Sequence, residues 1–298
     1  MIRLAVRVQR EQAELVLAEL LELAPAGVEE VQLGAETIEY AVYGAPGELP
    51  SLPDLKAAAG DALVDISTSH TADDWPERWK SFHRPILIEA PRPPGGGGRE
   101  VPDLFVRPPW EPASARRGAP LEEIVIDPGQ AFGTGAHAST RLCLELLLEL
   151  AALERPAGPL LDVGTGSGVL AIAAARLGFG PVLGLDHERE SVEAALENAA
   201  ANRVSVEVRR LDLLSEALPS MAAEDARSRP IVVTANLLRP LLLELAKTMP
   251  RAPAHLLAGG LLADEVAEVT SAFERRLGLR RRAERQSAGW AAVWLSAA

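Results

Sequence analysis

A glycine-rich turn between an apolar run and a helical pattern holds the residues with the clearest chemical use. The sequence reads Leu160-Leu-Asp-Val-Gly-Thr-Gly-Ser-Gly-Val-Leu170, with glycines at positions 164, 166 and 168. Glycines let the backbone turn tightly and approach a ligand closely, and the start of the following helix offers unpaired N–H groups. The pattern predicts a nucleotide-binding loop, with a purely structural turn as the other interpretation.

The spacing of these glycines separates two kinds of nucleotide site. A dinucleotide fingerprint, G-x-G-x-x-G, needs its third glycine where Val169 stands. The spacing D-x-G-x-G-x-G instead resembles the adenosylmethionine-binding loop of class I methyltransferases. A nicotinamide-dependent oxidoreductase is therefore kept only as an alternative, because its fingerprint fails and no hydride-handling residues stand out.

Polar side chains end the strands that follow. Asp186 closes Val-Leu-Gly-Leu-Asp, where a carboxylate can accept both ribose hydroxyls of an adenosine. Asp212 follows a further strand, and it either approaches the adenine amino group or caps a helix. Asn236 ends the apolar run Ile231–Ala235, at the sheet edge where cofactor or substrate is expected.

A second glycine-rich segment is Ile126-Asp-Pro-Gly-Gln-Ala-Phe-Gly-Thr-Gly-Ala-His-Ala-Ser-Thr140. It carries several hydroxyl groups and precedes a helix expected to begin near Thr140. Such a segment can fold over a bound ligand and exclude water. The alternative is a long structural loop in which Ser139 or Thr140 only caps the helix.

Periodicity predicts the elements that must position these residues. In the first 70 residues the order is βαββαβ, which is typical of a small ferredoxin-like α+β domain. From Asp127 onward short apolar strands alternate with helices, and this alternation favours a doubly wound α/β sheet of parallel strands covered on both faces. The strands are expected at 159–163, 182–185, 204–209, 231–234, 255–258, 279–282 and 291–295, and the helices at 169–177, 189–202 and 237–249.

Three regions follow from this pattern: a ferredoxin-like domain over 1–70, a linker over 71–100, and a doubly wound domain over 101–298. The resemblance of the glycine loop implies that the last is a methyltransferase domain, with the first as its substrate-recognition domain. The composition agrees with a cytoplasmic protein, because the single cysteine, Cys143, excludes an internal disulfide and no signal peptide or membrane span is evident. The net charge of −12 disfavours nucleic acid as a partner and is compatible with a basic protein substrate. The arginines at 275, 276, 280–282 and 285 are expected to be a solvated helix end and strand.

The second glycine-rich segment resembles one family, the PrmA methyltransferases that modify large-subunit ribosomal protein L11. The family pattern, roughly D-P-G-x-A-F-G-T-G-x-H-x-T-T, is matched at Asp127, Pro128, Gly129, Ala131, Phe132, Gly133, Thr134, Gly135, His137 and Thr140, with Ser139 keeping a hydroxyl. The glycine loop, Ala-Asn-Leu-Leu at 235–238 and the Trp75–Pro85 segment are similar as well. Asp186-His-Glu-Arg departs from the family's usual Asp-Ile-Asp-Pro but keeps the first carboxylate.

The resemblance implies S-adenosylmethionine as cofactor and amino groups of L11, on lysine side chains and at the N-terminus, as acceptors. It implies a cofactor site made of Phe132, Thr134, Thr140, Gly164, Gly166, Asp186 and Asn236, with no metal. Phe132, Thr134 and His137 would lie near the methyl group and the amine, and the catalytic candidates are Asn236 and His137. A structural hydrogen-bonding role is the alternative for His137.

Two further classes of function stay open at this point. One is a class I methyltransferase that acts on another protein or on a small molecule. The other is an interaction protein whose nucleotide fold no longer binds a cofactor, although the intact glycines and Asp186 speak against it.

Overall fold

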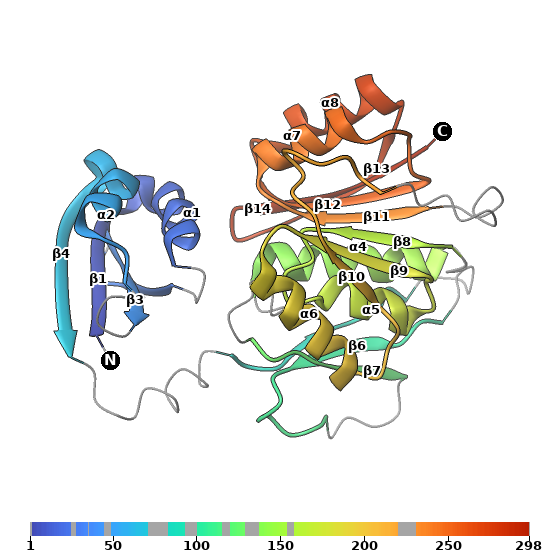
Figure 1. Cartoon of the computed structure of the whole chain (residues 1–298), viewed down its shortest axis with the longest axis horizontal. Helices are drawn as coiled ribbons and strands as arrows, with labels where there is room; N and C mark the ends of the chain where they lie inside the picture. The colour runs from blue at the N-terminus through green and yellow to red at the C-terminus, as the bar shows by residue number, and fades with distance from the viewer. Residues whose placement is uncertain are drawn as a thin grey trace. The chain divides into compact units, whose positions relative to one another are not determined.

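A computed structural model describes residues 2–24, 28–34, 36–44, 49–70, 83–92, 100–114, 120–128, 137–153, 158–219 and 231–297 (Figure 1). The chain divides into two compact units, Met1–Phe82 and His83–Ala298. Within the described residues, no helix has the length and apolar character required to cross a bilayer.

The first unit has the predicted βαββαβ order. Its elements are β1 Ile2–Gln9, α1 Ala13–Leu23, β2 Glu29–Gln32, β3 Thr37–Gly44, α2 Leu52–Ala59 and β4 Leu63–His70, with short 3₁₀ turns at Arg10–Gln12 and Gly60–Ala62. The strands form an antiparallel sheet in the order β2-β3-β1-β4. This order, with two helices as connections, is the ferredoxin-like arrangement that the sequence indicated.

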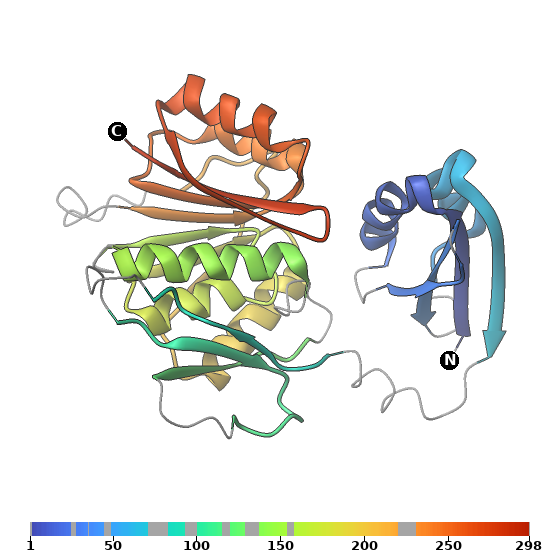
Figure 2. The ribbon, with the colours of Figure 1, turned by 180° about the vertical axis from the view of Figure 1, so that it is seen from behind.

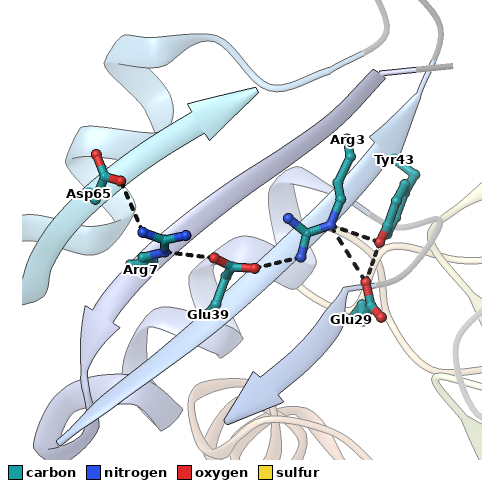
Figure 3. Close-up of polar contacts among 6 residues, drawn as sticks. All are labelled: Arg3, Arg7, Glu29, Glu39, Tyr43 and Asp65. Atoms are coloured by element: carbon teal, nitrogen blue, oxygen red, sulfur yellow. Dashed lines mark hydrogen bonds and ion pairs between the residues drawn. The ribbon is translucent and has the colours of Figure 1, made fainter. Parts of the chain in front are cut away.

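The two faces of this sheet differ because side chains alternate along a strand. Leu4, Val6 and Val8 of β1 pack in one core with Val16, Leu20 and Leu55 of the helices. The opposite face carries a polar network (Figure 3) in which Arg3 and Arg7 bind the two carboxylate oxygens of Glu39 at 2.6 and 2.7 Å. Burial opposes ionisation of Glu39, but the two guanidinium groups outweigh it and hold the pKa of Glu39 below its usual value.

The second unit is built on a seven-stranded sheet with the order β10-β9-β8-β11-β12-β14-β13. Its strands are β8 Leu160–Val163, β9 Val182–Asp186, β10 Glu207–Arg210, β11 Val232–Asn236, β12 His255–Leu262, β13 Arg280–Ser287 and β14 Trp290–Ser296. The first five in this order pair in parallel, as predicted.

The prediction of a parallel sheet is wrong for its last two strands. β14 pairs antiparallel with both β12 and β13. Only Ala288 and Gly289 connect β13 to β14, and both have positive φ, at 50° and 83°. A two-residue turn of this kind makes a hairpin, whereas a parallel pair needs a long crossover connection. β13 is an edge strand with several exposed arginines, and charges of this kind discourage pairing with another chain.

Helices cover both faces of this sheet, as Figure 1 and the reverse view in Figure 2 show. One face packs against α4 Ala138–Leu153, α5 Val169–Leu177 and α6 Arg189–Ala201, and the other against α7 Arg239–Thr248 and α8 Val266–Leu277. The span of helix α8 was not predicted, although its last turn carries Arg275 and Arg276, which were expected at a helix end. Its buried residues Val266, Val269 and Phe273 nevertheless have the helical spacing of three and four.

A small third layer covers the outer side of α4 and α5. It consists of β5 Ile86–Ile88, β6 Asp103–Arg107 and β7 Leu121–Val125, with β5 antiparallel and β7 parallel to β6. Apolar side chains of all three strands join the core that contains α4 and α5. Helix α4 therefore has apolar neighbours on two sides, and Cys143 on it is fully buried. Strand β5 lies inside the region predicted to be a linker.

Candidate functional site

The glycine loop joins the end of β8 to the start of α5. Gly164, Gly166 and Gly168 have φ values of 72°, 52° and 83°, a conformation that L side chains rarely adopt. A Cβ atom at Gly164 would lie 2.3 Å from the side chain of Leu237, and one at Gly168 would lie 3.1 Å from Ala195. The loop glycines are therefore required both by backbone conformation and by close packing against the segments after β11 and in α6.

Asp186 lies against this loop, as the sequence predicted. The N–H of Gly166 donates to Asp186 Oδ2 over 2.8 Å, and the N–H of Glu188 donates to Asp186 Oδ1 over 3.1 Å. The residue is 7% exposed. A carboxylate has about four acceptor positions, so two backbone donors leave room for two hydroxyl groups. The arrangement fits the ribose of an adenosine held beside the glycine loop.

A second carboxylate beneath the loop was not singled out by the sequence, although it is the first residue of the D-x-G-x-G-x-G pattern. Asp162 is fully buried and accepts hydrogen bonds from the hydroxyl groups of Thr165 at 2.7 Å and Thr234 at 2.6 Å. Burial raises the pKa of Asp162 to about 6, against the opposing effect of these two hydrogen bonds. Through these bonds Asp162 connects the glycine loop to β11.

Asn236 and Thr140 meet at the carboxyl edge of the sheet. Asn236 Nδ2 donates to Thr140 Oγ1 over 3.2 Å, although the two residues are 96 positions apart. Asn236 Oδ1 is buried and has no hydrogen-bond partner in the part of the chain that the structure describes. A buried acceptor without a partner costs about 1–3 kcal/mol. Its presence at a strand end fits an atom that awaits a donor on a ligand.

His137 is the N-cap residue of α4. The Ser139 N–H donates to His137 Nδ1 over 3.3 Å, and the Ser139 hydroxyl lies 2.8 Å from the same nitrogen. The ring meets Trp290 edge to face, with 4.8 Å between centroids. Burial lowers the pKa of His137, which favours the neutral ring. Trp290 was missed by sequence reasoning, because nothing in the local pattern at the start of β14 indicates this contact.

The remaining expectations have different outcomes. Phe132 and Thr134 lie outside the described residues. The carboxylate of Asp212 accepts hydrogen bonds from the Leu214 N–H at 2.9 Å and the Ser215 hydroxyl at 2.8 Å, so it stabilises a turn and not the start of a helix, while the adenine contact stays a prediction. The described part of the chain contains no group of three or more side chains suited to holding a metal ion.

The place of these residues in the sheet agrees with a ligand site. The helix after β8 packs on one face of the sheet and the helix after β11 packs on the other, so the strand order reverses between these neighbouring strands. Ligands of open α/β sheets bind outside the carboxyl ends of the strands at such a switch point. The glycine loop, Asp186 and Asn236 follow β8, β9 and β11 at this edge.

Comparisons with known proteins agree with one another. A family model described as ribosomal protein L11 methyltransferase (PrmA) matches residues 54–297. Proteins of that name from Caldicellulosiruptor saccharolyticus and Syntrophotalea carbinolica are 31% and 37% identical over 73% and 80% of this chain, and the matches cover 64% and 66% of those relatives. The chain thus spans slightly less than two thirds of their length. The crystal structure of a ribosomal protein L11 methylase from Lactobacillus delbrueckii subsp. bulgaricus aligns with a TM-score of 0.54 and 27% identity, covering 71% of this chain and 98% of that one.

Proposed function

The chain belongs to the ribosomal protein L11 methyltransferase family, PrmA, and from this premise we propose that it transfers methyl groups from S-adenosylmethionine to amino groups of ribosomal protein L11. The acceptors are lysine side chains and the N-terminal amine. The names of the relatives support the substrate, and the contact between the glycine loop and Asp186 supports the cofactor. The cytoplasm is the location that goes with this substrate, because ribosomes assemble there.

The residues present fit the cofactor. Asp186 would accept hydrogen bonds from the ribose hydroxyls, because the N–H groups of Gly166 and Glu188 occupy only two of its acceptor positions. Gly164 and Gly166 would lie along the ligand, and Thr140 and Asn236 would close the site beside β11. When bound, S-adenosylmethionine supplies a methyl group that is already activated on a sulfonium.

The protein's task is then to present a neutral amine in line with that methyl group. An ammonium group has no lone pair, so the amine must first lose a proton, and desolvation in a pocket lowers a lysine pKa from its ordinary value of about 10.4. Asn236 Oδ1 is a buried acceptor that can take a hydrogen bond from the amine and orient it. The hydrogen bond that His137 Nδ1 accepts from the Ser139 N–H supports the hydrogen-bonding role of that ring and not the role of a base.

The first unit is proposed to hold the protein substrate. Residues 1–53 carry nine acidic and three basic side chains, half of the net charge of −12. Complementary charge speeds the encounter with a basic partner.

The observation that carries the proposed function is the hydrogen bond from Gly166 to Asp186 at the switch point of the sheet. The test is intact-mass spectrometry of purified L11 after incubation with the enzyme and S-adenosylmethionine. The mass of L11 is expected to rise in steps that each correspond to a methyl group replacing a hydrogen. A reaction without enzyme is the control. Unchanged L11 alongside methylation of a different protein or small molecule would reject L11 as substrate and keep the chemistry.

A further inference from the structure

Two asparagines, Asn198 on α6 and Asn202 at the C-cap of this helix, bind the backbone at the end of β7. Asn202 Oδ1 accepts the Val125 N–H at 2.8 Å, and Asn202 Nδ2 donates to the Val125 carbonyl at 2.6 Å. Asn198 repeats this pairing two residues further along. Its Oδ1 accepts the Asp127 N–H at 2.9 Å, and its Nδ2 donates to the Asp127 carbonyl at 3.4 Å.

This arrangement replaces a neighbouring strand. Strand β7 pairs with β6 on one side only, and there the Ile126 N–H donates to the Arg107 carbonyl. The residues on either side of Ile126 therefore direct their backbone groups to the open edge, where the asparagines meet them. Positions i and i+4 of a helix are about 6 Å apart along its axis, close to the roughly 6.7 Å between positions i and i+2 of a strand.

Asn198 makes one contact that Asn202 does not. Its Nδ2 also donates to the carbonyl of Ser167, in the glycine loop, over 2.9 Å. The same face of α6 carries Ala195, which packs so closely on Gly168 that a Cβ there would lie 3.1 Å away. Asn198, which is 3% exposed, thus joins the glycine loop to Asp127.

Asp127 is where the chain leaves the small sheet and enters the segment that ends in His137 and Thr140. We propose that Asn198 is a positioning residue for methyl transfer, which sets the start of this segment relative to the glycine loop. The proposal rests on the function proposed above. It assigns Asn202 a different role, the attachment of β7 to α6, because the side-chain hydrogen bonds of Asn202 go to the backbone of Val125 and of Asn198.

The two asparagines provide a matched pair of variants. Each side chain is almost fully buried and makes three hydrogen bonds, so N198A and N202A should lower the melting temperature by similar amounts. At saturating S-adenosylmethionine and L11, N198A should lower kcat by about 100-fold, since small misplacement of reacting groups has effects of that size. N202A should stay within about threefold of the wild type. Equal losses of kcat in the two variants would overturn the proposal.

A second measurement needs no turnover. Hydrogen exchange of single amides, resolved by electron-transfer fragmentation, is followed with and without S-adenosylhomocysteine. In the wild type and in N202A, the ligand should slow exchange of the Asp127 amide by about tenfold, because binding at the glycine loop is transmitted through Asn198. In N198A, S-adenosylhomocysteine should no longer slow exchange of the Asp127 amide, although calorimetry should still detect binding of this ligand.

An Asp127 amide that responds to the ligand equally in N198A and the wild type would contradict the proposed link, as would a wild-type amide that does not respond. Failure of the proposed function has a different signature. In that case the wild type leaves L11 unmodified, while the exchange data still decide whether Asn198 connects the two segments.

Discussion

The backbone N–H of Gly166 donates to the carboxylate of Asp186 over 2.8 Å, which joins the loop after β8 to the end of β9. A second N–H, from Glu188, holds the other oxygen of the same carboxylate. Two fixed donors orient the group before any ligand arrives, and a group that is already oriented needs little reorganisation on binding. The carboxylate can therefore discriminate a ligand with two adjacent hydroxyls from one without them.

Replacing Asn236 by alanine is expected to lower kcat by about 100-fold, the size of effect seen when one oriented polar group is removed from a reaction site. Asn236 carries the buried acceptor without a partner, and its loss removes the proposed hydrogen bond to the amine. Steady-state methylation of L11 at saturating cofactor measures the effect. T140V is the comparison, because it removes the partner of Asn236 Nδ2 and keeps the acceptor. Activity of N236A at the wild-type level would exclude a role for Asn236 in turnover.

The buried carboxylate of Asp162 predicts a pH dependence of stability. Its pKa is about 6 in the folded protein and about 3.9 in an unfolded chain. The folded state therefore binds more protons between these values, and the stabilising contribution present below pH 4 is lost as pH rises through about 6. D162N cannot titrate, so its melting temperature relative to the wild type should rise from pH 4 to pH 6 and level off above. A difference independent of pH would contradict the buried titration.

Gly259 leaves space that two neighbouring residues use. A Cβ at this position would lie 2.3 Å from Cys143 Sγ and 3.1 Å from Asn236 Oδ1. G259A should therefore destabilise the protein by about 1–3 kcal/mol, the usual cost of overpacking a core, as measured by urea unfolding. The double variant G259A/C143A should recover part of this loss, because the smaller side chain relieves the closest contact. No recovery would indicate that the sulfur is not the obstacle.

Deleting residues 1–82 is expected to spare cofactor binding and abolish methylation of L11. The second unit, from His83 on, contains the glycine loop, Asp186 and Asn236. Calorimetry with S-adenosylhomocysteine and mass spectrometry of L11 separate the two effects. A truncated protein that methylates L11 at the wild-type rate would show that the first unit does not hold the substrate.

Much of the fold could be predicted because periodicity reflects local backbone geometry. The span predicted for the helix over 169–177 is the observed one, since Gly168 and Gly178 in left-handed conformations bound a run that is apolar except for Arg176. The antiparallel end of the sheet could not be predicted from alternation, because strand direction depends on the turn between the strands. Ala288-Gly289 makes that turn, although alanine seldom adopts positive φ.

The candidate site shows the same division. The spacing of the glycines and the acidic residue at a strand end predicted that the glycine loop and Asp186 lie together. The prediction was possible because the loop and Asp186 stand at the ends of neighbouring parallel strands. The roles of Asn198 and Asn202 could not be found this way. Their partners lie 71 and 77 residues away and are backbone atoms, which leave no signal in residue types. The contact of His137 with Trp290 likewise depends on how α4 packs near β14.

The most direct measurement of the central claim is titration calorimetry of S-adenosylhomocysteine with the wild type, D186A and H187A. His187 is the exposed neighbour of Asp186, so H187A controls for the loss of a side chain at this strand end. If Asp186 holds the ribose, D186A should bind at least about 100-fold more weakly, because each hydrogen bond to a charged group contributes about 1.5–3 kcal/mol, while H187A binds nearly as the wild type does. A folded D186A with wild-type affinity would contradict the assignment of the cofactor to this site.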